Sequence, residues 1–488
     1  MRPFALVIAI GLTANLSAQW PNSKVTVFSG PFSEEKEGSS EVRSLREGAN
    51  VVWMKTEQPF KGKMFVSVQE METGKDVSKW EVNTALAVRG IMAAGVSTAE
   101  VWAEEGMHLV YFYWNTKNKS MELATQRWDA NTGSSAPPLR PLHSIPVKFS
   151  FMGSELPSSY HVKNYSPDGS KVAFVNRSLK VLGERNSTVH LVHVLDRASM
   201  NLIWSAGYEL DDDFKEEGFQ VDDEGVVFML FGPGSSAAGT KNDTGYRLHR
   251  MQGEQHTQTS LELMPNRRTK YLKFVADPQG PRLSGFVLDP NDNKVVSDWI
   301  LLSIDANSLA TRDMAHGPLD RSLKFSHTVG NPLRLENGGF VRVAKDYQAS
   351  SMSKVKGLLE LRILAFGPGG DLEWQKALTL RDPADEYPVE FMLDDRFCIM
   401  FAGDPSIDGK GLFPVNDKTK LTDRPKCFAM MFDAQGNSEV VPATVGGQPV
   451  YQDGVFGASI GPGRFYASAN RVVPGGKMND YVIIELDK

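Results

Sequence analysis

The residues of this sequence that could do chemistry are mainly carboxylates. The densest acidic run is Asp211-Asp212-Asp213, and Asp289-Pro290-Asn291-Asp292-Asn293 spaces acidic and amide side chains much as a calcium loop does. Ca²⁺ prefers several such oxygen ligands. The second run, however, lacks the glycine and the closing glutamate of an EF-hand loop. We therefore expect a turn at 289–293 and a solvated acidic loop at 211–213, with no bound metal.

Histidine and nucleophile motifs add no catalytic residue. His190 and His193 lie three residues apart on one expected strand, which points them to opposite faces and excludes a simple chelate. The sequence contains no Gly-x-Ser-x-Gly and no His-Glu-x-x-His motif. A catalytic carboxylate pair cannot be singled out among 59 aspartates and glutamates. We predict no catalytic residue, no metal and no cofactor.

Composition limits the partners. The net charge is −6, which indicates neither nucleic acid nor an anionic lipid surface as a partner. Apolar residues make up 41% of the chain, enough to build a core.

The first residues predict export. Arg2 precedes an apolar run from Phe4 to Leu12, which is too short to span a bilayer, and Leu16-Ser17-Ala18 offers a cleavage site. We predict a signal peptide at residues 1–18, with a buried N-terminal strand as the alternative. The expected location is the periplasm, the outer membrane surface or the outside of the cell. No later run has the length and apolarity of a transmembrane helix.

The only cysteines, Cys398 and Cys427, are expected near the starts of two consecutive antiparallel strands. Such starts lie at opposite ends of the ladder, too far apart for a disulfide bond. We predict two free, buried thiols.

The elements that must position these residues form one repeated unit. A turn between two apolar strands recurs with spacings of 55 to 68 residues between the last turn residues. These turns are Arg46-Glu47-Gly48, Glu104-Glu105-Gly106, Pro167-Asp168-Gly169, Asp223-Glu224-Gly225, Pro278-Gln279-Gly280, Glu336-Asn337-Gly338, Leu393-Asp394-Asp395 and Gly461-Pro462-Gly463. A second hairpin with Asp, Asn or Gly in its turn follows each first one except the last.

Two hairpins per unit predict a four-stranded antiparallel sheet, the blade of a β-propeller. The eighth unit ends after a third strand, Tyr481–Leu486. The alternating segment Lys24–Phe28 is otherwise unpaired, so we predict that it closes the ring by pairing with that last strand.

The hairpin Tyr165-Ser166-Pro167-Asp168-Gly169-Ser170-Lys171-Val172-Ala173-Phe174 resembles the WD40-like, TolB-type repeat of exported bacterial β-propellers. The other units resemble that repeat in outline. This resemblance implies a platform that binds envelope proteins. Quinoprotein dehydrogenases carry a docking motif of roughly Thr-Gly-x-x-x-Trp late in each blade. This sequence has Trp80, Trp204 and Trp374 late in three units, but the spacing is irregular and most units lack the tryptophan, so we interpret them as aromatic packing between blades and infer no cofactor.

The expected fold is therefore all-β: a single β-propeller over residues 19–488, with eight four-stranded blades. The alternatives are a seven-bladed ring with one divergent unit, or two stacked β domains. We expect a monomer when no partner is bound.

Long connections are expected on one face of the ring, at 139–160, 207–218, 232–245, 344–356 and 403–425. Loops on a rigid scaffold commonly carry binding residues. The predicted partner-binding residues are Asp211, Asp212, Asp213, Lys345, Tyr347, Asp404 and Asp408.

The leading functional hypothesis is an exported, non-enzymatic scaffold that binds a protein or another macromolecule of the cell envelope. One alternative is a hydrolase or lyase acting on a polysaccharide or peptide, because a fold does not decide function. The other is a sensor module for a small ligand or a metal.

Overall fold

The computed structural model describes part of the chain, and the predicted signal peptide lies outside that part. The described residues are 23–29, 41–47, 50–57, 63–70, 76–83, 96–103, 106–115, 118, 120–128, 139–146, 161–180, 187–211, 214–233, 245–265, 267–277, 280–292, 295–324, 330–335, 337–347, 358–381, 389–393, 396–402, 404–407, 427–442, 444–445, 448–449, 457–461, 464–473 and 476–486.

Every regular element in these ranges is a β-strand, as predicted. The first four sheets in chain order are all antiparallel. They comprise β2 (Glu41–Glu47), β3 (Asn50–Glu57), β4 (Lys63–Glu70) and β5 (Asp76–Asn83); β6 (Val96–Ala103), β7 (Gly106–Asn115), β8 (Ser120–Trp128) and β9 (Arg140–Pro146); β10 (His161–Tyr165), β11 (Lys171–Lys180), β12 (Ser187–Asp196) and β13 (Leu202–Asp211); and β14 (Phe214–Val221), β15 (Val227–Pro233), β16 (Arg247–Gln252) and β17 (Gln255–Ser260).

The remaining sheets continue this form with one addition, a fifth strand. They comprise β18 (Thr269–Val275), β19 (Arg282–Leu288), β20 (Val295–Ile304) and β21 (Thr311–Lys324); β22 (Leu333–Arg334), β23 (Phe340–Tyr347), β24 (Leu358–Phe366), β25 (Leu372–Arg381) and β28 (Asp404–Ile407); β26 (Val389–Leu393), β27 (Arg396–Ala402), β29 (Cys427–Phe432) and β30 (Ser438–Pro442); and β33 (Gly457–Gly461), β34 (Arg464–Val473), β35 (Gly476–Leu486) and β1 (Ser23–Ser29). A short pair, β31 (Thr444–Val445) and β32 (Gln448–Pro449), lies apart from them.

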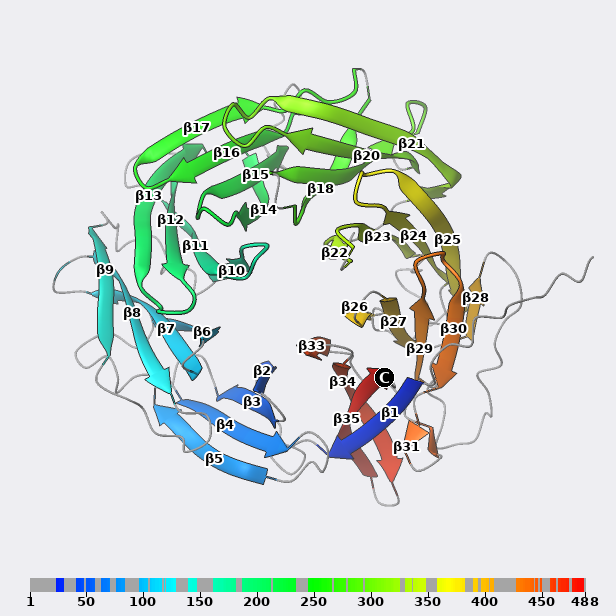
Figure 1. Ribbon diagram of the computed structural model, residues 1–488, viewed down its shortest axis with the longest axis horizontal. Coiled ribbons are helices and arrows are strands. Elements are labelled where there is room, and N and C mark those ends of the chain that lie inside the picture. Colours follow the sequence, from blue (N-terminus) through cyan, green and yellow to red (C-terminus); the bar gives the residue numbers. More distant parts are fainter. Residues whose placement is uncertain are drawn as a thin grey trace, which may run out of the picture.

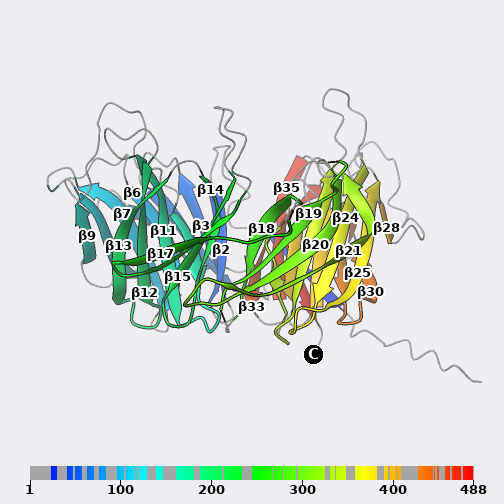
Figure 2. The ribbon, with the colours of Figure 1, turned by 90° about the horizontal axis from the view of Figure 1, so that it is seen from above.

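The sheets are arranged around a common centre in a propeller-like manner. Figure 1 shows the first strand of each sheet innermost and the later strands toward the outside. Figure 2 shows the strands running between two opposite faces. None of the described segments is a helix long and apolar enough to cross a membrane.

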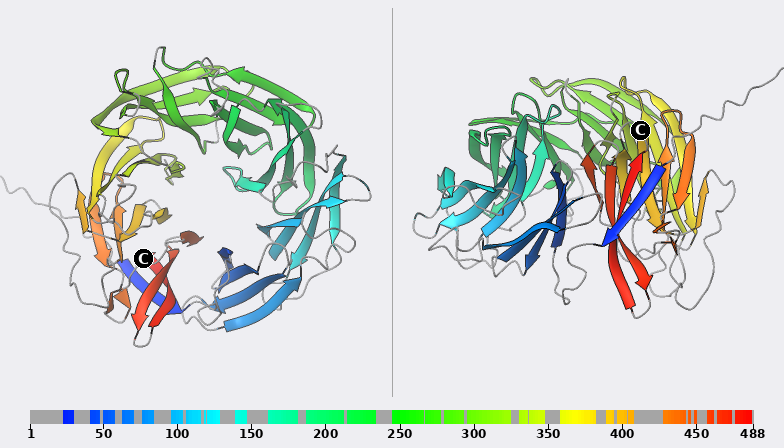
Figure 3. Two further views of the ribbon diagram at one scale, coloured as in Figure 1. Left: turned by 180° about the vertical axis from the view of Figure 1, so that it is seen from behind. Right: turned by 60° about the horizontal axis from the view of Figure 1, so that its bottom comes forward.

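The N-terminal strand pairs with the last strand, as predicted. β1 runs antiparallel to β35, with Ser23 opposite Leu486 and Ser29 opposite Asp480. Figure 3 shows β1, in blue, beside the red strands of that sheet. The two ends of the described chain therefore share one sheet.

The core consists of side chains packed between neighbouring sheets. On β15, Val227, Met229 and Phe231 pack against the β10–β13 sheet. The alternating residues Phe228 and Leu230 pack instead against the β18–β21 sheet. Because both faces of such a strand are buried, its sequence is a continuous apolar run.

The two faces of the ring differ in what they carry. Each first strand starts, and each second strand ends, at the face that we call the loop face. The hairpin turns lie at the opposite, turn face. At the hairpin 165–174 the predicted turn is confirmed: Gly169 has a φ of 72°, and its N–H donates to the Ser166 carbonyl at 2.9 Å.

Three connections predicted on the loop face are partly strand, and those predictions were wrong in extent. β13 continues to Asp211 and β14 begins at Phe214, so the 207–218 connection is mostly ladder. β23 continues to Tyr347, beyond the expected start of a loop at Ala344. Residues 404–407 form β28, which pairs with β25 of the preceding sheet. In each case cross-strand pairing continues the ladder past the polar residues that suggested a loop.

The thiol prediction is confirmed for Cys398, which is buried and forms no disulfide bond. The ladder places Cys398 opposite Met431, whereas Cys427 lies opposite Ala402 at the other end. The two strand starts are separated as the antiparallel geometry requires.

Tryptophans join neighbouring sheets on the turn face, as predicted for Trp204 and Trp374. Trp204 Nε1 donates to the Gly225 carbonyl at 2.8 Å, and Trp374 Nε1 donates to the Ala434 carbonyl at 2.9 Å. A β-bulge directly precedes each tryptophan, because the strand register shifts there and leaves Ile203 and Glu373 unpaired. Bulges re-aim the side chains that follow them. Trp80 occupies β5, and its side chain lies outside the described atoms.

We expect the Trp204→Phe variant to lose about 1 kcal/mol of unfolding free energy, because the indole hydrogen bond disappears while most of the packing stays. Urea unfolding measures this change. Ile203→Ala is the matched control, since Ile203 is 43% exposed and should change stability by no more than about 0.5 kcal/mol. Equal effects of the two substitutions would contradict a docking role for Trp204.

Buried histidines should make the fold sensitive to acid. Burial lowers the pKa of His193 and of His249 to about 3, with smaller contributions from His143 and His256 respectively. In the unfolded chain each of these two histidines binds a proton near pH 6.5, whereas in the folded chain it does so only near pH 3. Stability is therefore full above pH 6.5 and falls, between pH 6.5 and 3, by about 1.4 kcal/mol per pH unit for each such histidine.

The measurement is the pH dependence of the urea midpoint between pH 7.5 and pH 5. His193→Gln should flatten this dependence, whereas Ile203→Ala, at an exposed position that does not titrate, should leave it as in the parent chain. An unchanged slope in His193→Gln would show that His193 is protonated in the folded state.

Candidate functional site

The predicted partner-binding residues do not come together in one place. The structure puts them at strand ends or leaves them outside the described ranges: Asp211 ends β13, Lys345 and Tyr347 lie on β23, Asp404 begins β28, and Asp212, Asp213 and Asp408 lie outside. Of these, only Lys345 has a described side chain. Their partner-binding role stays a prediction, and the site must be sought from the contacts of other residues.

Lys345 links two sheets and is not displayed on a loop. Its ammonium lies 2.5 Å from the Glu390 carboxylate on β26, and the two side chains are 11% and 9% exposed. The prediction that Lys345 lies on a loop was wrong, because it lies in β23 and a partner in the next sheet holds its charge inside.

Arg342, three residues earlier on β23, is buried and incompletely paired. Its Nη2 donates to the Tyr271 carbonyl, and its Cζ lies 5.8 Å from the centre of the Phe286 ring. Within the described residues its Nε and Nη1 have no hydrogen-bond partner. Burial lowers the pKa of Arg342 to about 9, and the Glu390 carboxylate opposes that shift. The guanidinium stays charged at neutral pH and fixes the backbone that it contacts.

That backbone is a bulge in the innermost strand β18. Tyr271 has a φ of 56°, which is unusual for a bulky residue, and the register against β19 shifts between Lys270 and Lys273. Gly285 on β19 makes room for the bulge, since a Cβ there would lie 2.8 Å from Leu272 Cδ1. Backbone strain of this kind concentrates at functional sites. The bulge therefore marks the loop-face end of β18 as the candidate site.

Lys273 anchors the other side of the bulge. Its ammonium lies 3.1 Å from the Glu217 carboxylate on β14 and also donates to the Glu217 carbonyl. Burial, followed by the Glu217 charge, raises the pKa of Tyr271. The phenol is therefore protonated at neutral pH, so it can donate a hydrogen bond but is a poor general base.

The stretch that contains this bulge is basic: Arg267, Arg268, Lys270 and Lys273 fall within seven residues. None of these four cations was among the predicted binding residues, although their spacing is visible in the sequence. Arg267 is held by the Asp298 carboxylate and the Ser297 hydroxyl. Arg268 and Lys270 are exposed, and they take part in none of the ion pairs formed within the described ranges. These two cations remain available to an anionic partner.

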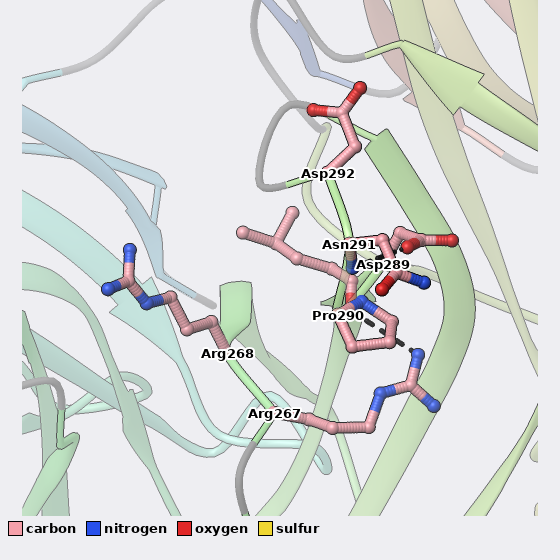
Figure 4. A pocket seen from close by; sticks show the side chains of 7 residues that line it. Arg267, Arg268, Asp289, Pro290, Asn291 and Asp292 are labelled. Atoms are coloured by element: carbon pink, nitrogen blue, oxygen red, sulfur yellow. Dashed lines mark hydrogen bonds between the residues drawn. The ribbon is translucent and has the colours of Figure 1, made fainter.

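A polar pocket of about 410 Å³ opens beside this stretch on the loop face. Its lining comprises Arg267, Arg268, Leu288, Asp289, Pro290, Asn291 and Asp292. Figure 4 shows Arg268 and Asp292 on different sides of it, and its dashed line joins Arg267 to Leu288, whose carbonyl accepts a hydrogen bond from Arg267 Nη2 at 3.3 Å. The turn predicted at 289–293 is confirmed over its described part, where the Asn291 N–H donates to Asp289 Oδ1 at 2.7 Å.

A second pocket, of about 260 Å³, contains two histidines that touch. His249 Nδ1 and His256 Nε2 are 2.9 Å apart, the ring planes differ by 13° and the ring centres are 5.1 Å apart. The ring centres are farther apart than the two nitrogens by about the sum of the two ring radii. The two nearly parallel rings therefore lie side by side, edge to edge, and not one above the other. Each nitrogen faces the other, as in an N–H···N hydrogen bond, whereas a metal needs both lone pairs directed at a third point.

No group of three or more potential metal ligands occurs within the residues that the structure describes. His190 and His193 point to opposite faces, as predicted: His193 Nδ1 lies 2.6 Å from the Ser205 hydroxyl, while His190 Nδ1 lies 3.8 Å from the Glu216 carboxylate.

Comparison with known proteins gave likenesses of shape only. No protein-family model matches the sequence, and no curated protein matches it. Similar solved structures include the polysaccharide lyase Uly1, with 10% identity over 91% of this chain and 89% of that chain and a TM-score of 0.42. The WD40 domain of SCAP from fission yeast has 7% identity over 96% of this chain and 98% of that chain, with a TM-score of 0.38.

The β-propeller domain of the Trilobed protease from Pyrococcus furiosus is a third similar structure. It has 9% identity over 78% of this chain and 96% of that chain, with a TM-score of 0.31. At such TM-scores, what this chain does must follow from its own residues.

We expect Lys345→Met to lower the unfolding free energy by about 3–5 kcal/mol, because it leaves the Glu390 carboxylate buried without its cation. The double variant Lys345→Met/Glu390→Gln should recover most of that loss. Lys270→Met, at an exposed position, is the control and should stay within about 0.5 kcal/mol. Urea unfolding of the three variants tests the buried pair, and a Lys345→Met effect as small as the control would instead support a surface position.

Proposed function

We propose that the chain is an exported, non-enzymatic scaffold whose loop face binds an acidic macromolecule of the cell envelope or surface. In this proposal the fold is a single eight-bladed propeller that is closed by β1 and acts as a monomer in the periplasm, at the outer membrane or outside the cell. The pairing of β1 with β35 supports closure of the ring. The signal-like residues 1–18 support export.

The observation that carries the proposal is the pair of exposed cations, Arg268 and Lys270, at the edge of a rigid strand. Their backbone is held by the bulge that Arg342 and Gly285 support. A partner's acidic groups can therefore bind without ordering a loop, which lowers the entropic cost of association. Charge at an exposed rim also speeds association with an oppositely charged partner.

Asp222, a carboxyl group whose pKa burial raises, belongs to a turn rather than to a catalytic site. Catalytic acids and bases need pKa values near the working pH. Within the described ranges, burial raises the pKa of one carboxyl group, Asp222, and this group accepts hydrogen bonds from Val226 and Glu224 of its own turn. These hydrogen bonds make Asp222 part of its own turn, so its raised pKa does not indicate a catalytic role.

The test is affinity capture from native envelope extract by the mature chain and by Arg268→Glu/Lys270→Glu. We expect the parent chain to capture an acidic partner that high salt releases, since exposed charges are screened. The variant should lose this partner, because the two introduced glutamates repel the partner's acidic groups.

The matched control is Arg127→Glu/Arg334→Glu, which makes the same change of charge at exposed arginines near the turn face. The control should capture the partner as the parent does. Equal capture by both variants would reject the site, and no capture by the parent chain would reject the scaffold and bring the enzyme and small-ligand alternatives forward.

A further inference from the structure

The polar pocket on the loop face is built from two walls that backbone hydrogen bonds hold together. The Leu288 N–H donates to the Arg268 carbonyl at 2.9 Å, which joins the walls. The turn is closed by Asp289 N–H to the Val295 carbonyl at 2.8 Å and by Val295 N–H to the Asp292 carbonyl at 3.0 Å. A ligand would therefore meet side chains whose backbone is already in place.

The lining favours a ligand rich in hydroxyl groups. Asn291 offers both a donor and an acceptor, Asp292 offers acceptors, and Arg268 offers a planar set of donors. Hydroxyl groups both donate and accept, so they can use all three. Of the two apolar residues in the lining, Leu288 is only 2% exposed, so Pro290 alone presents apolar surface, which is less than a peptide anchor usually needs.

The positive charge beside the pocket restricts the class of ligand further. Arg268 and Lys270 lie two residues apart along an extended backbone, which directs both side chains to the same side. Arg268 lines the pocket, and Lys270, which is exposed but not part of the lining, adds a second positive charge two residues further along the chain. An anionic group in the ligand would bind there, while its hydroxyl groups would face Asn291 and Asp292.

We propose that this pocket binds an acidic sugar unit of a polysaccharide, with Arg268 and Lys270 binding its anionic group and Asn291 and Asp292 binding its hydroxyls. The inference rests on the proposed scaffold function and names the ligand of that same face. The pocket volume of about 410 Å³ is within the range of small-ligand sites.

Isothermal titration of the mature chain with four probes of equal length tests this assignment. The probes are an oligogalacturonate hexamer, a sulfated hexasaccharide, neutral maltohexaose and hexaglutamate. We expect binding of at least one acidic saccharide, and the two acidic saccharides distinguish carboxylate from sulfate as the recognised group. Maltohexaose and hexaglutamate should bind at least about tenfold more weakly. Maltohexaose lacks the anionic group, and hexaglutamate lacks the sugar hydroxyl groups.

Two variants separate the two kinds of contact. Arg268→Gln/Lys270→Gln should weaken the acidic saccharide at least about tenfold by removing charge-assisted hydrogen bonds. Asn291→Ala/Asp292→Ala should also weaken it, although removing Asp292 adds net positive charge to the pocket. Arg334→Gln, near the turn face, should bind like the parent chain.

Hexaglutamate binding as strong as that of the acidic saccharides would overturn the assignment and leave a patch selective only for negative charge. Failure of both acidic saccharides would also overturn it. If the parent chain still captures a partner from envelope extract in that case, only the sugar assignment fails. If the capture fails as well, the proposed scaffold function fails with it.

Discussion

The structure depends on the packing of sheets against neighbours on both sides, as the β14–β17 sheet shows. On β15, successive residues alternate between two cores, so Met229 and Leu230 stabilise different interfaces. A sheet in such an arrangement has no solvent-facing side at its inner strands. Its stability is shared with its neighbours, as in other repeat architectures where each unit buries its surface against the next. Charged residues that enter these interfaces must bring their partners with them.

The charged residues around β18 follow that rule. Glu217 and Lys273 pair across one interface, Arg342 reaches Tyr271 across the next, and Lys345 pairs with Glu390 across a third. Buried ion pairs are weak sources of net stability, because desolvation offsets much of their attraction. Their effect here is positional: each fixes the angle and depth at which two sheets meet, and they leave Arg268 and Lys270 as the exposed cations at the rim.

The fold was predictable because its signals are local. Turn residues such as Gly169 and alternating strands such as 189–195 are visible within ten residues of sequence, and they indicated the sheets and the pairing of the first strand with the last. The site was not predictable in this way. Lys345 looked like a loop residue because its partner lies 45 positions away in another sheet, and the bulge at Tyr271 depends on Gly285 and Arg342 from two other strands.

The shared sheet at the chain ends has a consequence for synthesis. β1 is the first described strand to be made, yet its neighbour β35 is the last. The other sheets take their strands from nearby sequence and can form as the chain lengthens, whereas β1 must wait until all of them have been made. The entropic cost of bringing the two strands together grows only with the logarithm of the length of chain between them. The long separation of β1 and β35 therefore delays their pairing but adds little to its free-energy cost. A ribosome that stops early would therefore release a chain whose first strand has nothing to pair with.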